Sequence, residues 1–273
     1  MNLPFVFLLL LFGHVIGDFY LQSLEMAKRK NACWKYMAVH GLIYTVCMAA
    51  VLFFGVEHSL KLLWLWLFIV VTHIAVDITK GFFRRKRRYW KIYKKIPTKL
   101  CRGIYKKICK KILLFDQLTH LVLLVIAWCI WGRDLLLRDW TSALLPYFSQ
   151  RHFVVLLGVL IILRPVGLLI ANRGIWGFNR SNKTSGGVQE DAGKMIGYLE
   201  RIIVFFLLVH GQYTAISFVI AAKSIMRFPE INDSIRSGNE KNKSAPAEYY
   251  LIGTLLSMAS VFVVALLLGL MEA

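Results

Sequence analysis

Three pairs of histidine and aspartate lie in the first half of the sequence, and the members of each pair are four positions apart. The pairs are His14 with Asp18, His73 with Asp77, and Asp116 with His120. Residues at this spacing share one face of a helix, so each pair presents an imidazole and a carboxylate to the same neighbour. Such mixed ligands suit Zn, Mn or Fe, and the residue types alone do not choose among them. The pairs therefore predict a site for one or two divalent metal ions.

The order of residues within the pairs fits a single shared site. The first two pairs run from histidine to aspartate, whereas the third runs from Asp116 to His120. Because consecutive spans run in opposite directions, the reversal places a deeper histidine layer and a shallower carboxylate layer at one end of a four-helix bundle, where dinuclear sites are known to form. His40 adds an imidazole near that end. The expected metal ligands are His14, Asp18, His40, His73, Asp77, Asp116 and His120.

The same residues suggest how a reaction could proceed. The sequence pairs no serine, cysteine or lysine nucleophile with a base, so a metal-activated water is the expected nucleophile. Asp18, Asp77 and Asp116 are the expected catalytic carboxylates, which ligate or bridge the metal, with one of them acting as general base. The expected outer contacts, to ligands or to an anionic substrate, are Gln22, Lys28, Lys80 and Gln117.

The elements that carry these residues are predicted to be membrane-spanning helices. Of the 273 residues, 58% are hydrophobic, and they come in blocks of roughly twenty, the length that crosses a bilayer. The expected fold is an all-α polytopic membrane bundle of about seven transmembrane helices, with an N-terminal four-helix core and a basic amphipathic interfacial helix. The expected spans are about 3–22, 37–56, 60–79, 112–132, 153–172, 201–222 and 249–270.

The basic residues predict the orientation of the chain. Most of the 34 lysine and arginine residues fall in the connections after the first, third and fifth expected spans. The positive-inside rule then places the amino terminus outside and the carboxyl terminus in the cytoplasm. The expected location is a bacterial inner membrane.

One cytoplasmic segment, at 84–112, holds much of this charge. Its apolar residues recur at helical spacing between lysines, which predicts an interfacial helix on anionic inner-leaflet lipid. Ordinary positive-inside topology with a long loop explains the charge equally well. No nucleic-acid partner is expected, because the aromatic residues lie on the apolar face and no base-reading motif is present.

Two membrane domains are expected. Residues 1–132 form a four-span domain that contains the histidine and aspartate pairs and a basic cytoplasmic loop at 80–111, and residues 133–273 form a three-span domain. The five cysteines are scattered and include no Cys-x-x-Cys pair. They therefore predict neither a disulfide framework nor a thiolate metal site.

Several polar motifs also carry a family resemblance. In order, "GHVIGDFYLQ", "MAKRK", "VHGLIY", "THIAVDITK" and "FDQLTHL" resemble the motif series of the integral-membrane family catalogued as domain of unknown function 3307, over about residues 5–125. The resemblance implies a grouping of motif positions and supplies no activity. The motif positions are His14, Asp18, Gln22, Lys28, His40, His73, Asp77, Lys80, Asp116, Gln117 and His120.

Three functions remain open from the sequence. The first is a metal-dependent membrane hydrolase that acts on a phosphorylated or lipid-like substrate from the cytoplasmic side. The second is a transporter or channel that binds a cation or relays protons through the same residues. The third is a metal-stabilised scaffold without turnover. Clustering of the ligands near one membrane face favours the enzyme, since transport sites usually lie near the midplane.

Overall fold

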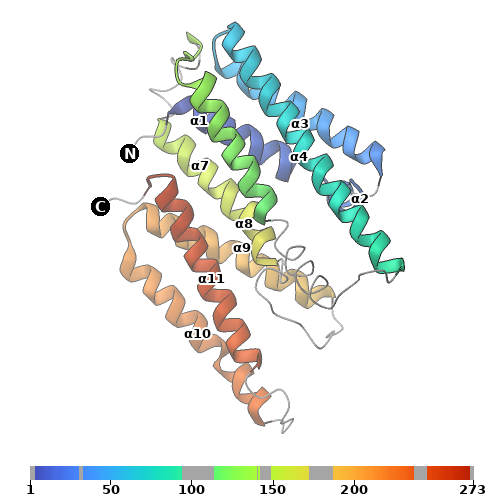
Figure 1. Cartoon of the computed structure of the whole chain (residues 1–273). Coiled ribbons are helices and arrows are strands. Elements are labelled where there is room, and N and C mark those ends of the chain that lie inside the picture. The colour runs from blue at the N-terminus through green and yellow to red at the C-terminus, as the bar shows by residue number, and fades with distance from the viewer. Residues whose placement is uncertain are drawn as a thin grey trace. The chain divides into compact units, whose positions relative to one another are not determined.

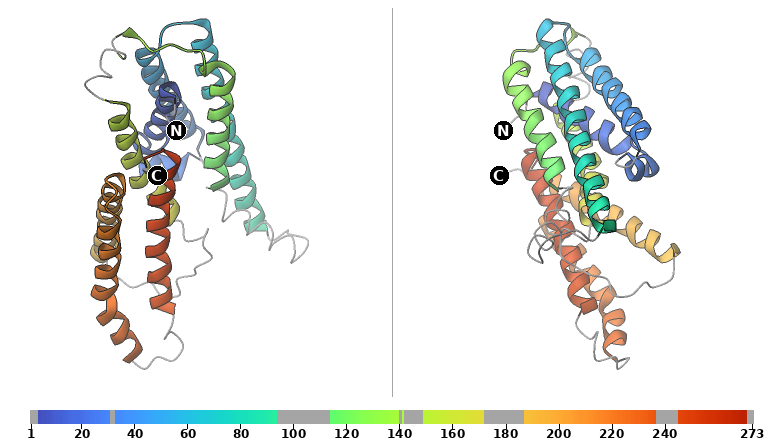
Figure 2. Two further views of the ribbon diagram at one scale, coloured as in Figure 1. Left: turned by 90° about the vertical axis from the view of Figure 1, so that its left-hand side faces the viewer. Right: turned by 45° about the vertical axis from the view of Figure 1, so that its right-hand side comes forward.

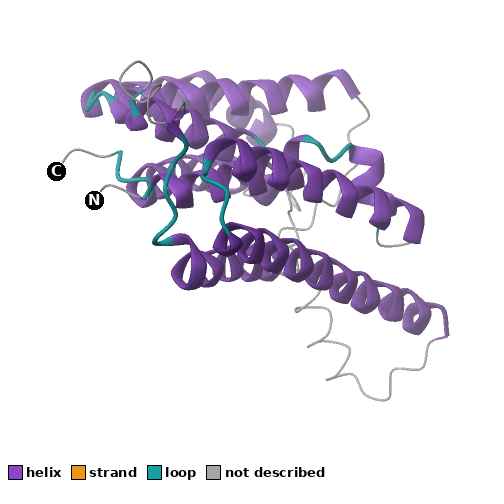
Figure 3. Cartoon of the chain, turned by 90° about the horizontal axis from the view of Figure 1, so that it is seen from above, coloured by secondary structure: helices purple, strands orange, loops and turns teal. Residues whose placement is uncertain are grey.

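The structure is a computed structural model that describes residues 4–30, 33–93, 114–139, 141, 149–171, 187–236 and 245–270. Within these ranges, the side chains of residues 24, 28, 83–93, 171, 187–192, 194, 226–236 and 245–251 are outside the description. The described residues form helices and short connections, with one isolated bridge between Val56 and Leu137 (Figure 3). The predicted all-α bundle is confirmed. The chain divides into two compact units, at residues 2–150 and 151–273.

The first unit is a ring of four helices. Its elements are α1 (Phe5–Val15), the π-helix η1 (Ile16–Tyr20) that continues it, the short α2 (Leu24–Arg29), α3 (Trp34–Gly55), α4 (Leu60–Tyr93), and a helix over residues 114–132 that ends in the π-helix η2 (Trp128–Gly132). Both α1 and α4 pack against α3 on one side and against η2 on the other (Figure 1). The ring therefore encloses a common interior.

The helices have the length and composition of membrane spans. Four are long and apolar enough to cross a bilayer: Trp34–Gly55, Leu60–Phe82, Leu114–Gly132 and Gln150–Ile170. Large apolar side chains on their outer faces, including Leu42, Phe54 and Trp64, are exposed, as expected for residues that contact lipid. These features indicate a membrane protein. Shorter apolar helices lie at Phe5–Tyr20, Tyr213–Ile225 and Ile252–Leu267.

Helix α4 is longer than the expected span. The hydroxyl oxygen of Ser59 accepts a hydrogen bond from the backbone N–H of Leu62 at 3.2 Å and so caps its first turn. The helix then continues to Tyr93, so residues 80–93 of the expected basic loop extend α4. Residues 94–113, and the side chains of the expected lipid-binding segment at 84–112, lie outside the described residues.

Two glycines allow α1 and η1 to approach α3 closely. A Cβ atom at Gly13 would lie 2.7 Å from the sulfur of Met48, and a Cβ atom at Gly17 would lie 2.9 Å from Cδ2 of Tyr44. Both distances are too short for a side chain to be added without movement. Small residues at a helix contact bring the backbones together, and here they bring the end of α1 next to Tyr44.

We expect Gly17→Val to lower the free energy of unfolding by about 1 to 3 kcal/mol, the usual cost of overpacking. The added side chain must displace the ring of Tyr44, which is 1% exposed. Thermal unfolding in detergent measures the effect. The matched control is Gly253→Val in α11, where an added Cβ meets no atom within 4 Å. Equal effects at the two positions would contradict the close contact.

The second unit contains α7 (Gln150–Leu163), α8 (Pro165–Ala171), α9 (Gly187–Val209), α10 (Tyr213–Arg236) and α11 (Ala245–Leu267). Helix α9 packs against α10 and α11, and α11 also packs against α8. Helices α7 and α8 separate at Arg164 because Pro165 has no N–H and is favoured at the first position of a helix. At this break Nε of Arg201 donates to the carbonyl of Ile162 at 3.0 Å.

The expected single span over 201–222 is wrong, because α9 and α10 form a hairpin. Gly211 has a φ of 67°. The N–H of Gln212 bonds to the carbonyl of Leu207 at 2.8 Å, and the N–H of Gly211 bonds to that of Leu208 at 3.1 Å. This Schellman motif ends α9 and reverses the chain. Hydropathy alone did not reveal the reversal, because both arms are apolar.

An ion pair between Glu200 of α9 and Lys223 of α10 joins the two arms. The two residues are therefore at the same level of the hairpin, on opposite sides of its turn. Figure 2 shows α10 running alongside α11 after this reversal (Figure 2). Residues 187 and 236 are the two ends of the hairpin, and both consequently lie opposite its turn. The chain therefore reverses direction once more than the sequence predicted.

Candidate metal centre

A change in helix type positions the first carboxylate. Asp18 lies in the π-helix η1, which widens the last turn of α1, and single π turns are common at functional sites. His14 and Asp18 consequently reach different partners. Nδ1 of His14 lies 3.2 Å from the hydroxyl of Tyr44, whereas Oδ1 of Asp18 lies 3.3 Å from Nε2 of His40.

Asp18, His40, His73 and Asp77 form what we call the first ligand set. Nε2 of His40 lies 3.1 Å from Oδ2 of Asp77 and 3.4 Å from Nε2 of His73. Nε2 of His73 lies 3.9 Å from Oδ2 of Asp77. All four side chains are buried, and their ligand atoms lie within 4.8 Å of one another. A tetrahedral ion with bonds of about 2.0 to 2.2 Å separates its ligand atoms by about 3.3 to 3.6 Å, so the residues fit a metal ion.

Asp77, Asp116 and His120 form the second ligand set, which shares Asp77 with the first. Oδ1 of Asp116 lies 3.7 Å from Nε2 of His120. Both atoms are buried, and neither has a hydrogen-bond partner within the described part of the chain. Nζ of Lys80 lies between the two carboxylates of this set, 2.9 Å from Oδ1 of Asp77 and 2.6 Å from Oδ2 of Asp116.

Lys30 is a member of the cluster that the sequence analysis missed. Its Nζ lies 2.8 Å from Oδ2 of Asp77 and 3.6 Å from Oδ1 of Asp18. With the amide of Gln22 oriented to satisfy its neighbours, Lys30 also donates to the Gln22 side-chain oxygen at 3.1 Å. The expected Lys28 has a side chain outside the described residues. The motif "MAKRK" contains both lysines, but it lies between two expected spans, where no apolar periodicity could choose between them.

Gln22 and Gln117 contact the aspartate layer, as expected for residues that hold the ligands from outside. Nε2 of Gln117 donates to Oδ2 of Asp18 at 3.0 Å and lies 3.4 Å from Oδ2 of Asp116. In the orientation given above, the amide nitrogen of Gln22 donates to the backbone carbonyl of Asp18 at 2.9 Å. Gln22, Lys80 and Gln117 are partly exposed, unlike the ligand residues. They form the accessible edge of the cluster.

The charges of the cluster nearly balance. The three aspartates face the ammonium groups of Lys30 and Lys80, so the buried carboxylates outnumber the ammonium groups by one when the imidazoles are neutral. Burying an unpaired charge is costly. The remaining negative charge favours the uptake of a cation.

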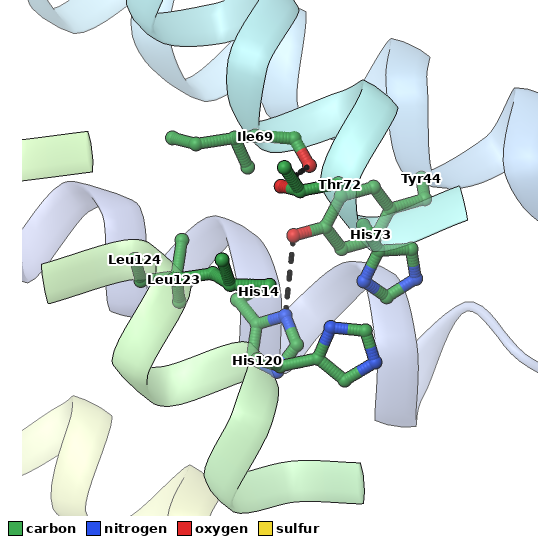
Figure 4. Close-up of a pocket in the computed structure, with 8 residues that line it drawn as sticks. All are labelled: His14, Tyr44, Ile69, Thr72, His73, His120, Leu123 and Leu124. Atoms are coloured by element: carbon green, nitrogen blue, oxygen red, sulfur yellow. Dashed lines mark hydrogen bonds between the residues drawn. The ribbon is translucent and has the colours of Figure 1, made fainter. Parts of the chain in front are cut away.

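The histidines form a stacked layer on the apolar side of the carboxylates. The rings of Tyr44 and His73 are parallel within 4° with centroids 3.6 Å apart, and the rings of His73 and His120 are 4.3 Å apart. Figure 4 shows His14 bonded to Tyr44 beside this stack (Figure 4). A cavity of about 10 Å³, enough for about one water molecule, lies here. Its lining residues are His14, Tyr44, Ile69, Thr72, His73, His120, Leu123 and Leu124.

Tyr44 was not predicted as a site residue, although it follows His40 by one helical turn. Tyrosine is common in apolar spans, so residue type gave no signal. We expect Tyr44→Phe to lower the free energy of unfolding by about 1 kcal/mol, through loss of the hydrogen bond to His14, with metal content unchanged. Tyr44→Leu also removes the ring that stacks on His73, and we expect metal affinity to fall. Thermal unfolding and metal titration measure these effects, and a normal affinity in Tyr44→Leu would contradict a positioning role.

A comparison with protein families matches residues 6–154 to the family described as protein of unknown function (DUF3307). The match covers more than half of the chain. The chain belongs to this family. The DUF3307 region contains both ligand sets together with Lys30, Tyr44 and Lys80. No curated protein and no solved structure matches the chain.

The chain is a helical member of DUF3307 whose apolar helices indicate a membrane protein, and its buried histidine and aspartate groups could hold a metal ion. Of the expected ligands, His14 belongs to neither ligand set among the described residues, and its Nδ1 faces the hydroxyl of Tyr44. The other six belong to the two sets.

Proposed function

We propose that this protein is a metal-dependent membrane hydrolase. The observation that carries the proposal is the first ligand set, in which two imidazole nitrogens and two carboxylate oxygens from three helices are buried within 4.8 Å of one another, close enough to bind one divalent ion. Zn, Mn and Fe all accept such ligands. Rigid helices are suitable supports for a site of this kind.

The proposed reaction needs a proton acceptor that other side chains of the cluster leave free. When bound, the ion supplies a Lewis acid and an activated water. Asp116 is the proposed general base, because Lys80 and Gln117 hold its Oδ2 while its Oδ1 is available. With a phosphate ester as substrate, Oδ1 would take a proton from the attacking water while the water oxygen bonds to phosphorus and the ester P–O bond breaks. The proton then passes to the leaving oxygen, which balances the reaction.

The proposed substrate is phosphorylated or lipid-like. Lys80 and Gln117 place N–H donors at the accessible edge, and such donors bind the oxygens of an anion. The exposed apolar faces of the helices suit contact with acyl chains. We further propose that the basic segment at 84–112 binds anionic inner-leaflet lipid and concentrates the substrate.

We propose a bacterial inner membrane, with the amino terminus outside and the carboxylate layer on the cytoplasmic side. Most basic residues fall in the connections at that end of the first unit. The hairpin of α9 and α10 changes the expectation for the carboxyl terminus: if α7–α8 and α11 each cross, the chain also ends outside. Reporter fusions at the two termini are expected to place both ends outside. A cytoplasmic reporter at either end would overturn this orientation.

The test of function is hydrolysis after metal exchange. Protein in detergent is stripped with a chelator, reloaded with Zn, Mn or Fe, and assayed with phosphomonoesters, phosphodiesters and phosphatidic acid. We expect metal-dependent turnover that Asp18→Asn abolishes, because that carboxylate belongs to the first ligand set. Metal binding without turnover on any substrate would instead favour the metal-stabilised scaffold.

A second candidate, cation or proton transport, is favoured by the histidine layer. The small cavity beside this layer is lined by three histidines and Tyr44. Chains of ionisable groups of this kind serve as proton relays in transporters. Proteoliposomes with a pH or cation gradient distinguish the two functions. Gradient-driven flux without hydrolysis would replace the enzyme with a transporter.

A further inference from the structure

The second ligand set already contains a cation. Nζ of Lys80 lies 2.9 Å from Oδ1 of Asp77 and 2.6 Å from Oδ2 of Asp116. These are charge-assisted hydrogen bonds. The side chain is 9% exposed, and Lys80 follows Asp77 by three positions on α4, so both are fixed on one rigid helix.

A second metal ion would need the same position. To bind Asp77 and Asp116 together, the ion would lie about 2.0 to 2.2 Å from one oxygen of each, between the oxygens that Lys80 now joins. Two cations cannot share that space. Oδ2 of Asp77 belongs to the first ligand set. Without the two oxygens that Lys80 joins, the second ligand set is therefore left with His120 and Oδ1 of Asp116, which are 3.7 Å apart.

Lys30 joins only one carboxylate of the first ligand set by a hydrogen bond. Its Nζ lies 2.8 Å from Oδ2 of Asp77 but 3.6 Å from Oδ1 of Asp18, and Gln22 offers it another acceptor. The two imidazole nitrogens of the set, 3.4 Å apart, face each other directly. That separation is the one expected of two nitrogens that bind the same ion, and Lys30 contacts neither of them.

We infer that the cluster binds a single metal ion, in the first ligand set, and that the ammonium group of Lys80 takes the place of a second ion. The inference rests on the proposed metal site. Two-metal sites use the second ion to stabilise charge on the transferred group. Here Lys80 supplies that positive charge, which makes it a specificity residue for anionic, phosphoryl-type substrates.

The experiment is metal stoichiometry after saturation with Mn²⁺ and removal of free ion, by elemental analysis and by electron paramagnetic resonance. We expect one equivalent and the signal of an isolated ion in the wild type. We expect Lys80→Gln to approach two equivalents with a spin-coupled signal. The matched control is Lys61→Gln, which removes an exposed lysine of the same helix that pairs with Asp134, and it should remain at one equivalent.

Two further variants keep the inference testable if Lys80→Gln folds poorly. Asp116→Asn should retain one equivalent, since it leaves the first ligand set intact. The charge-matched double variant Lys80→Gln with Asp116→Asn should also retain one. Two equivalents in the wild type, or loss of an ion in Asp116→Asn, would overturn the inference and leave the metal site standing. A wild type that binds no metal would overturn both.

Discussion

Asp77→Asn is expected to lower the free energy of unfolding by about 3 to 5 kcal/mol, the cost of breaking a buried charged network on one side. The carboxylate contacts Nζ of Lys30, Nζ of Lys80 and Nε2 of His40, and the residue is 1% exposed. Its removal leaves two buried ammonium groups short of a partner. Thermal and denaturant unfolding in detergent, each with and without metal, measure the loss.

The control for this variant is Asp134→Asn. Asp134 pairs with Lys61 at 2.9 Å, but the two side chains are 74% and 58% exposed. Exposed pairs contribute less than about 1 kcal/mol. If Asp77→Asn were no more destabilising than this control, the buried network would not be holding the four helices together.

Asp116→Asn is expected to lower the rate of hydrolysis by about 100-fold to 10,000-fold, the usual range for a lost general base. Asparagine keeps the shape of the side chain and its contact with Lys80, but it cannot accept the proton of the attacking water. Metal content should stay at the wild-type value. The measurements are kcat on the best phosphoryl substrate and elemental analysis of the same sample.

The two readouts separate the possible roles of Asp116. Loss of both metal and activity would make Asp116 a ligand rather than the base. Wild-type activity would remove it from the reaction altogether. Asp134→Asn again serves as the control, because its exposed carboxylate should affect neither measurement.

Much of the cluster was predictable because its residue types are rare in membrane spans. An aspartate or histidine in an apolar helix is costly and points inward by default. The spacing of His73 and Asp77, and the reversed order of Asp116 and His120, indicated a common end of the bundle. The structure brings these four residues together with Asp18 and His40.

Other features depended on geometry that the sequence pattern does not encode. The π turn at η1 directs Asp18 toward His40 and leaves His14 with Tyr44. Lys30 enters the cluster from a connection, where no helical period applies. The reversal at Gly211 depends on a left-handed residue between two apolar arms, which a hydropathy window merges into one span.

The most direct test of the metal site is elemental analysis of purified, reconstituted protein, comparing the wild type with His73→Ala and with His58→Ala. His73 is 2% exposed within the first ligand set, whereas His58 lies outside both sets, with Nε2 3.1 Å from the carbonyl of Phe53. We predict one equivalent of Zn, Mn or Fe in the wild type and in His58→Ala, and loss of that ion in His73→Ala. Full occupancy in His73→Ala, or no metal in the wild type, would contradict the metal site.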